Sequence, residues 1–269
     1  MDVYDRAELW SRDHIEHTQV IRLKTTIAQA RKCAFYKKRL DDAGINEDSI
    51  KDPSDIKKIP FTTKQDLRDQ YPMGLVTVPP SELVRMHCSS GTTGTPVAIC
   101  HTANDLNTWS DLMARCMYMV GVRKDDVFQN MSGYGLFTGG LGIHYGAERL
   151  GCLTIPAGAG NTKRQIKLAK DFHTTVAHIL PSYALIVGER LREMGDDPRE
   201  FPLRIALVGA EPYTEEFRRR LETLFDMQVY NSYGLSEMNG PGVGFECQAQ
   251  NGLHIWEDAY LPEVVNPET

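Results

Sequence analysis

From residue 83 onward, short apolar runs alternate with amphipathic segments of helical length, and this alternation limits the possible folds most. Strands are expected at residues 83–88, 96–101, 125–130, 152–155, 175–179, 204–208 and 228–230. Helices are expected at residues 103–120, 163–171, 183–194 and 215–225. Strands that alternate with helices of this length favour an α/β fold with mainly parallel sheets flanked by helices.

The first 80 residues lack this alternation and are typical of a helical region. Apolar residues recur at helical spacing between residues 6 and 39, and prolines then divide the chain into short helices and turns. Thr62-Thr63-Lys64-Gln65 fits a capping box for a brief helix that ends near Asp69. The expected organisation is a helical region at 1–80 followed by an α/β core at 81–269.

The charge balance argues against nucleic acid and membrane partners. The 269 residues include 30 Lys and Arg against 36 Asp and Glu, which gives a net charge of −6. Such a chain has no basic footprint for nucleic acid or an anionic membrane. Its longest apolar run, Cys116–Val122, is far shorter than the roughly 18 residues of a spanning helix. The acidic N-terminus also lacks the apolar segment of a signal peptide.

The six cysteines are widely scattered, which favours a reduced, cytoplasmic compartment over a disulfide framework. Most of them are expected to pack as small hydrophobic side chains.

In open α/β sheets, ligands bind at the carboxyl ends of the strands, so the loops there are the first candidates for a site. The loop after the first strand is Ser89-Ser90-Gly91-Thr92-Thr93-Gly94-Thr95. Its glycines let backbone amides approach an anion, and its hydroxyls add donors, which favours phosphate contact over a merely flexible turn. The loop is not a Walker A motif, because the Gly-Lys-Ser/Thr ending is missing.

A second glycine-rich segment, residues 134–146, interleaves glycines with aromatic residues. It suits a flat apolar ligand lying against backbone, and it equally suits a helix start packed tightly on the sheet. The spacing from Gly142 to Gly146 is one residue too long for a dinucleotide-binding motif, which excludes a Rossmann interpretation.

Two further motifs follow the later strands. They are Gly209-Ala210-Glu211-Pro212 and Tyr233-Gly234-Leu235-Ser236-Glu237. The tyrosine ring could stack on a base, the serine hydroxyl could bind phosphate, and the carboxylate could hold a hard cation such as Mg²⁺. Either motif alone could be an ordinary loop.

In this order, the four motifs resemble the phenylacetate–CoA ligase family of adenylate-forming, acyl-CoA synthetase-like enzymes. Residues 61–68, 144–149 and 240–242 carry further parts of the resemblance, which extends over essentially the whole chain. It implies the large N-terminal domain of such an enzyme, with an AMP-binding core at 81–269. It also implies a two-step reaction, in which ATP converts an aryl acid, with phenylacetate as the leading candidate, to an acyl-adenylate and coenzyme A then displaces AMP.

The resemblance implies a nucleotide role for four groups of residues. Residues 89–95 would hold the β- and γ-phosphates, and Gly209, Ala210, Glu211 and Pro212 would line the adenine site. Tyr233, followed by Gly234, would stack on the base. Ser236 would touch the α-phosphate, and Glu237 would coordinate Mg²⁺; these two are the catalytic candidates.

The resemblance also implies an aryl-acid pocket. Its wall would be formed by Tyr134, Phe137, Gly140 and Pro241, with Ser132 beside them. Many relatives carry an aromatic residue where Ser132 stands, so the serine could leave room for a bulkier or hydroxylated aryl group. Many relatives also carry lysine at the position of Thr95, so one phosphate-neutralising charge is absent here.

Relatives continue beyond the position of Thr269 into a mobile C-terminal domain. That part carries an aspartate for the ribose, the hinge and a lysine that assists adenylation. The chain is therefore expected to be part of a ligase, with little or no activity alone. The resemblance further suggests a homodimer that uses the N-terminal helices.

Cys247 and His254 form a Cys-x6-His arrangement. Thiolate and imidazole are good zinc ligands, but two are too few for a closed site. Some relatives have a Cys-x-Cys pair further along that could complete a structural zinc site. The alternative is a packed cysteine and a surface histidine.

Two other functions stay open at this point. One is an adenylating enzyme that loads a carrier protein instead of coenzyme A. The other is a non-catalytic module that binds a nucleotide or a partner without turnover; Thr95 and the absent C-terminal domain favour it.

Overall fold

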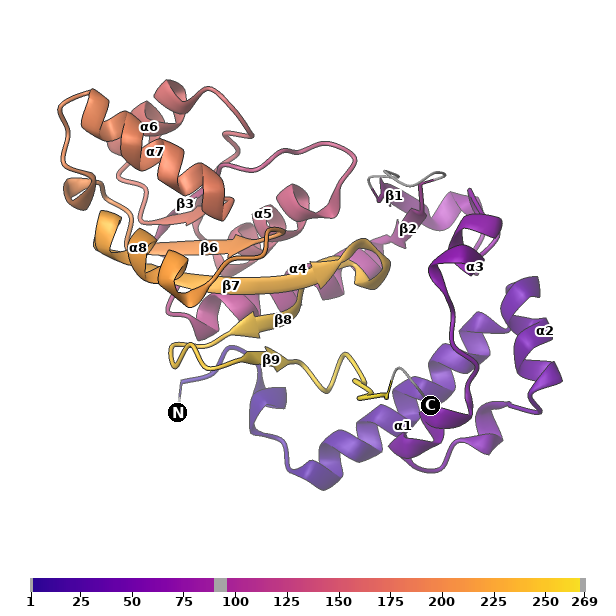
Figure 1. Ribbon diagram of the computed structural model, residues 1–269. Coiled ribbons are helices and arrows are strands. Elements are labelled where there is room, and N and C mark those ends of the chain that lie inside the picture. The colour runs from indigo at the N-terminus through magenta and orange to yellow at the C-terminus, as the bar shows by residue number, and fades with distance from the viewer. Residues whose placement is uncertain (1, 90–95, 267–269) are drawn as a thin grey trace. The chain divides into compact units, whose positions relative to one another are not determined.

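The computed structural model describes residues 2–89 and 96–266 (Figure 1). The chain forms two compact units. One comprises residues 2–4 and Asp105–His254; the other comprises Asp5–Asn104 and the described residues from Ile255 onward. The expected boundary at residues 80 and 81 does not separate these units, because the first two strands belong with the N-terminal helices.

The first unit is built on a sheet with strand order β4-β3-β5-β6-β7-β8-β9. Its strands are β3 (Val127–Asn130), β4 (Leu153–Ile155), β5 (Val176–His178), β6 (Ile205–Gly209), β7 (Gln228–Leu235), β8 (Gly240–Glu246) and β9 (Leu253–Ile255). Strand β3 pairs in parallel with β4 and β5, β5 with β6, and β6 with β7, whereas β8 is antiparallel to β7. The expected mainly parallel α/β architecture is confirmed.

Helices cover this sheet. They are α4 (Ala103–Met119), α5 (Thr138–Leu150), α6 (Thr162–Asp171), α7 (Pro181–Glu193) and α8 (Glu215–Phe225), with short 3-10 turns η5 (Pro198–Glu200) and η6 (Ser236–Met238). Alternate strand residues such as Ala177, Ala206 and Val208 share one buried core with α6, α7 and α8. Helix α5 packs against β3, β4 and β8.

Helix α5 approaches α4 closely because it carries glycine at the contact. A Cβ atom on Gly142 would lie 2.2 Å from Cζ2 of Trp109, and one on Gly146 would lie 2.4 Å from Cβ of Met113. Real Cβ atoms do not approach so closely, so both positions require glycine. Of the two interpretations of residues 134–146, helix packing explains these two glycines.

The second unit contains the N-terminal helices and a hairpin. Its helices are η1 (Arg6–Leu9), α1 (Arg12–Ala30), α2 (Ala34–Asp42), η2 (Glu47–Ser49), η3 (Pro53–Lys58), α3 (Lys64–Asp69) and η4 (Pro80–Glu82). Strands β1 (Leu83–Cys88) and β2 (Ala98–Thr102) pair in antiparallel fashion. Ile27, Leu40, Ile45 and Ile50 form a separate core. Thr63 caps α3 in a capping box with Asp66, which confirms the short helix expected there.

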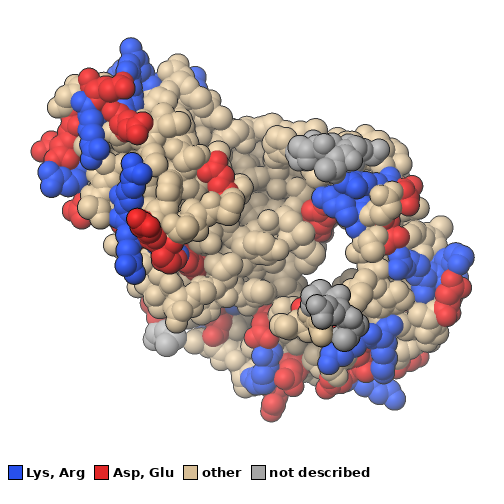
Figure 2. Space-filling view, in the orientation of Figure 1, with Lys and Arg blue, Asp and Glu red and all other residues tan. Residues whose placement is uncertain are grey.

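On the face in view in Figure 2, charged side chains of both signs lie over helices that cover the sheet. Figure 2 shows Lys and Arg intermixed with Asp and Glu over α6, α7 and α8. Among the described residues, no helix has the length and apolar character needed to cross a bilayer.

Candidate active site

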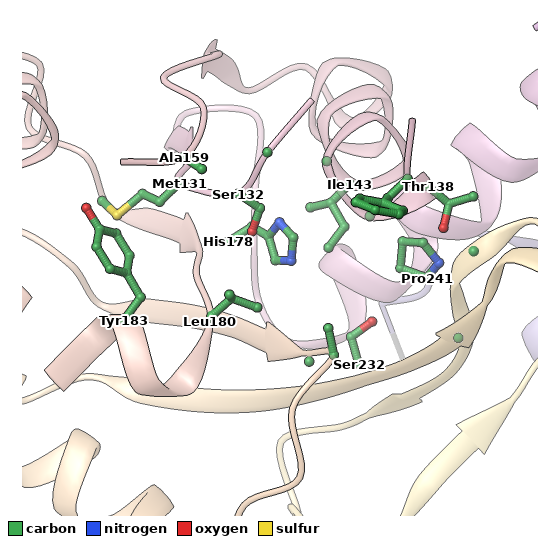
Figure 3. A pocket seen from close by; sticks show the side chains of 18 of the residues that line it. Met131, Ser132, Thr138, Ile143, Ala159, His178, Leu180, Tyr183, Ser232 and Pro241 are labelled. Atoms are coloured by element: carbon green, nitrogen blue, oxygen red, sulfur yellow. The ribbon is translucent and has the colours of Figure 1, made fainter. Parts of the chain in front are cut away.

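A cavity of about 610 Å³ lies within the first unit, at the carboxyl ends of the central strands. Met131 and Ser132 follow β3, Leu180 follows β5, and Gly209 and Ala210 end and follow β6. Residues of β7, β8, the start of α5, the first turns of α7 and the loop after β4 also line the cavity (Figure 3). The cavity therefore occupies the edge of the sheet where α/β proteins bind their ligands.

Backbone approaches backbone around this cavity. A Cβ atom on Gly140 would lie 2.2 Å from the carbonyl oxygen of Gly133, and one on Gly209 would lie 2.5 Å from that of Ser232. The next residue, Ala210, has φ +64°, a left-handed conformation that costs a non-glycine residue free energy. The Gly209-Ala210 step is thus held in an unusual shape where it faces the cavity.

Asn130, the last residue of β3, joins three parts of the cavity wall. Its Nδ2 atom donates to the carbonyl of Gly140 at 3.0 Å, at the start of α5. Its Oδ1 atom accepts from the backbone N–H of Ser132 at 3.1 Å and lies 3.0 Å from Nδ1 of His178. One buried amide therefore fixes the end of β3, the end of β5 and the first turn of α5.

His178 is a buried, neutral residue of this wall. It is only 7% exposed, and burial lowers the pKa of its ring to about 4. Burial disfavours the charged imidazolium, so the ring is uncharged near pH 7.

Several residues expected in the acid pocket do line the cavity. They are Ser132, Phe137, Gly140 and Pro241. Tyr134 is placed differently, outside the described lining. Its hydroxyl lies 2.9 Å from Nδ1 of His144, whose Nε2 lies 3.0 Å from Glu148. Burial raises the pKa of Tyr134, which keeps the phenol protonated at neutral pH.

Only part of the expected adenine motif, residues 209–212, lines the cavity. Gly209 and Ala210 line the cavity, whereas Glu211 turns to the start of α7. Its carboxylate accepts from the backbone N–H of Ser182 at 3.1 Å and from the Ser182 hydroxyl at 2.9 Å. Pro212 is exposed. Glu211 therefore caps α7 and fixes the path of the motif beside the cavity.

The motif 233–237 lies at the rim. The lining includes Gly234 and Gly240, and the chain between them carries η6 with Ser236 and Glu237, both half-buried. Tyr233 is 52% exposed, so one side of its ring is open to a ligand.

Ser89 of the hydroxyl loop and the pair Cys247 and His254 are not among the described residues that line the cavity. Ser89 belongs to the second unit, where its Oγ accepts from the N–H of Val97 at 3.0 Å; residues 90–95 lie outside the described residues. Cys247 is half-buried and His254 is exposed. In residues 2–89 and 96–266, no group of three or more His, Cys, Asp or Glu is placed to hold a metal ion. The zinc interpretation stays a prediction that needs ligands beyond this pair.

Comparison with known proteins gives the family. The family model described as "AMP-binding enzyme" matches residues 14–261. The chain belongs to the AMP-binding enzyme family.

The relatives of this AMP-binding chain agree with the resemblance found in the sequence. It is 43% identical to phenylacetate-coenzyme A ligase of Pseudomonas putida, over 98% of this chain and 61% of that protein. It is 44% identical to the Thermus thermophilus protein of the same name, over 97% of this chain and 59% of that protein. The chain thus spans about three-fifths of the length of these curated relatives.

Solved structures agree on the architecture. A 2-hydroxyisobutyryl-CoA ligase in complex with 2-HIB-AMP and CoA superposes with a TM-score of 0.92 at 28% identity. The match covers 98% of this chain and 58% of that chain. The expected fold, the mainly parallel α/β architecture of adenylate-forming enzymes, is confirmed.

Several lining residues of the AMP-binding chain were missed by motif reasoning. They include His178, Leu180, Tyr183 and Ser232. The first two lie at the carboxyl end of β5, a strand that the sequence predicts. The rule that ligands bind at such ends would have identified them, but the loop after β5 carries no glycine motif.

Proposed function

We propose that the whole protein carrying this chain is an AMP-forming ligase that joins an aryl acid, with phenylacetate as the leading candidate, to coenzyme A. One observation carries the proposal: a glycine-walled cavity lies at the carboxyl ends of the parallel strands, with the Tyr233–Glu237 segment at its rim. Phe137, Ile143 and Leu180 give its lining an apolar character that suits an aromatic ring. The names of the relatives support the same substrates.

The nucleotide would lie across the ends of β6 and β7. Gly209 and Ala210 would face the adenine, with Glu211 and Pro212 setting the path of this loop, and the half-exposed ring of Tyr233 would stack on it. Ser236 would then reach the α-phosphate. Ser89 and the residues after it would hold the β- and γ-phosphates, as the sequence resemblance implies.

Glu237 would hold a magnesium ion that arrives with ATP. Mg²⁺ usually binds through one or two carboxylates, substrate phosphates and several waters. One carboxylate at the rim therefore fits this donor set, although the described residues hold no cluster of ligands for a resident metal. The ion would supply charge neutralisation on the phosphates.

Catalysis of these two steps then depends mainly on holding the reactants in position. The acid carboxylate attacks the α-phosphorus of ATP and pyrophosphate leaves; the thiol of coenzyme A later attacks the acyl carbon and AMP leaves. The cavity would hold the aryl group still and keep water from the adenylate, while Ser236 would orient the phosphate.

Two further properties belong to the proposal. The reaction would take place in the cytoplasm, in keeping with six cysteines that are all free thiols. The protein would form a homodimer through the N-terminal helices, where Ile21 of α1 is 51% exposed. Sedimentation of the whole protein at twice its subunit mass would support the dimer, and a monomer would contradict it.

The test is pyrophosphate release by the whole protein with ATP, Mg²⁺ and a panel of aryl acids. Release should require an acid, and an acyl thioester should form only when coenzyme A is added. Release without any acid, or no thioester with coenzyme A, would contradict the proposal.

A further inference from the structure

The cavity lining is mostly apolar or glycine, and its polar side chains are Ser132, Thr138, His178, Ser182, Tyr183 and Ser232. Two of these, His178 and Ser132, lie beside each other in Figure 3 and form one polar region. Both residues bind the same oxygen of Asn130, and the N–H of Met131 donates to the carbonyl of His178 at 2.9 Å. Their proximity therefore follows from the hydrogen bonds as well as from the view.

The hydrogen bonds around Asn130 fix the tautomer of His178. The backbone N–H of Ser132 can only donate and the carbonyl of Gly140 can only accept, so both ends of the Asn130 amide are assigned. The atom that faces Nδ1 of His178 is thus the amide oxygen. Nδ1 must carry the hydrogen, and in a neutral ring the Nε2 atom is left with a lone pair.

That lone pair and the Ser132 hydroxyl have no described protein partner. The hydrogen bond of the ring is made by Nδ1, and His178 lines the cavity while being 7% exposed. The Ser132 oxygen is buried and no described protein group hydrogen-bonds it. A buried polar atom left unpaired is destabilising, so the Ser132 oxygen favours a ligand that pairs with it. His178 lines the same cavity, so its Nε2 lone pair can accept from the same ligand.

A hydroxyl group matches this pair best. It can donate to Nε2 of His178 and accept from the hydroxyl of Ser132 at the same time. A carbonyl has no hydrogen to offer Nε2. An ammonium group would be an unpaired buried charge, because the described lining contains no Asp, Glu, Lys or Arg.

We propose that this region makes the cavity selective for an aryl acid that carries a hydroxyl group, with His178 as the specificity-determining residue. The inference rests on the proposed function and narrows its substrate class. Met131, Ile143 and Leu180 around the polar pair supply the apolar contacts for the ring. A ring without a hydroxyl fits the same space but leaves Nε2 unpaired.

The test compares kcat/KM for pyrophosphate release by the whole protein between phenylacetate and its 2-, 3- and 4-hydroxy derivatives. At least one hydroxylated acid should be preferred by tenfold or more. His178→Phe keeps a flat ring without the lone pair. In this variant the ratio of kcat/KM for the hydroxylated acid to that for phenylacetate should fall close to one, with phenylacetate still turned over. His17→Phe, on the exposed side of α1, is the matched control and should leave the preference unchanged.

Ser132→Ala removes only one oxygen, so it provides a second test if His178→Phe does not fold. This variant should also reduce the preference for the hydroxylated acid over phenylacetate. The ring ¹⁵N resonances of His178 give a readout independent of turnover. They should show a protonated Nδ1 and an unprotonated Nε2 that shifts when the preferred hydroxylated acid is added.

Two outcomes would overturn the inference. They are turnover of phenylacetate with no preferred hydroxylated acid, and an Nε2-protonated ring. Neither of them would contradict the proposed ligase activity. Pyrophosphate release with none of the acids would instead contradict the proposed function, and the inference with it.

Discussion

Asn130 is the residue on which the shape of the cavity depends most directly. Its side chain pairs with Gly140, Ser132 and His178, and it is fully buried. Asn130→Ala would leave a carbonyl and an N–H without their partner, at about 1–3 kcal/mol for each group. We expect the free energy of unfolding in urea to fall by about 2–4 kcal/mol. Asn251→Ala, at an exposed turn, is the control and should change little; an equal loss in both would remove this role from Asn130.

Asp126 has a comparable role at the other end of the strands. Its carboxylate accepts from the N–H of Arg123 at 2.7 Å, the hydroxyl of Thr175 at 2.7 Å and Nε of Arg204 at 3.0 Å. Burial alone would raise the pKa of Asp126. The hydrogen bond from Arg204, with those from Arg123 and Thr175, outweighs burial and lowers the pKa below its ordinary value. The side chain thus joins the segments that lead into β3, β5 and β6.

This depressed pKa predicts a pH dependence. The stabilisation by ionised Asp126 is complete above the unfolded pKa, near 4, and is lost as the pH falls through the lower folded pKa. Asp126→Asn should therefore lower the free energy of unfolding at pH 7 by about 1–2 kcal/mol, allowing for solvent screening of the half-exposed Arg204. The difference from the original protein should shrink as the pH is lowered toward 2. Asp197→Asn, at an exposed ion pair with Arg199, should show a smaller effect; a loss for Asp126→Asn that is constant with pH would contradict the assignment.

At the level of elements, the contact between α4 and α5 depends on Gly142, because glycine has no side chain to separate the two helices. Gly142→Ala would place a Cβ atom 2.2 Å from the Trp109 ring, and overpacking of this kind costs about 1–3 kcal/mol. The better helix propensity of alanine offsets up to about 1 kcal/mol of this. We expect a net loss of about 1–2 kcal/mol in urea denaturation.

Gly139, on the same helix, supplies the control. A Cβ atom there would have no neighbour within 4 Å. Gly139→Ala should therefore leave the stability unchanged or raise it slightly. If both variants lost the same stability, the close approach of α5 to Trp109 would not be the cause.

The sequence predicts the regular elements well where their periodicity is strong. The strands before the glycine motifs and helices α4, α6, α7 and α8 occur within a few residues of the expected positions. The sequence leaves helix α5 as one of two interpretations, because its glycines are ordinarily unfavourable in a helix. The sequence does not predict strand β8, since the glycines and proline of 240–242 are typical of a turn and only pairing with β7 makes them a strand.

At the level of the whole molecule, only some residues of the predicted motifs line the cavity. Gly140, Gly209 and Gly234 of the glycine motifs line the cavity, because close backbone approach requires glycine and glycine is visible in the sequence. The positions of the Tyr134 and Glu211 side chains depend on hydrogen-bond partners on other elements, His144 on α5 and Ser182 on α7, which lie 10 and 29 residues away in the chain. Local sequence carries no signal for such partners, so these two side chains could not be placed from it.

The proposed magnesium role of Glu237 has a direct test in the whole protein. Glu237→Ala should lower kcat/KM for pyrophosphate release by more than tenfold, which corresponds to over about 1.4 kcal/mol of lost transition-state stabilisation. Glu216→Ala changes an exposed carboxylate on α8 and should leave this value nearly unchanged. A loss below tenfold for Glu237→Ala would argue against the role.

The measurement that tests the central claim most directly is exchange of labelled pyrophosphate into ATP, catalysed by the whole protein without coenzyme A. This exchange reports only formation and reversal of the acyl-adenylate, the step to which the cavity and its rim are assigned. We predict exchange that depends on an aryl acid and is strongly reduced by Glu237→Ala. Exchange that is absent with every aryl acid, or that proceeds equally well without one, would contradict the account.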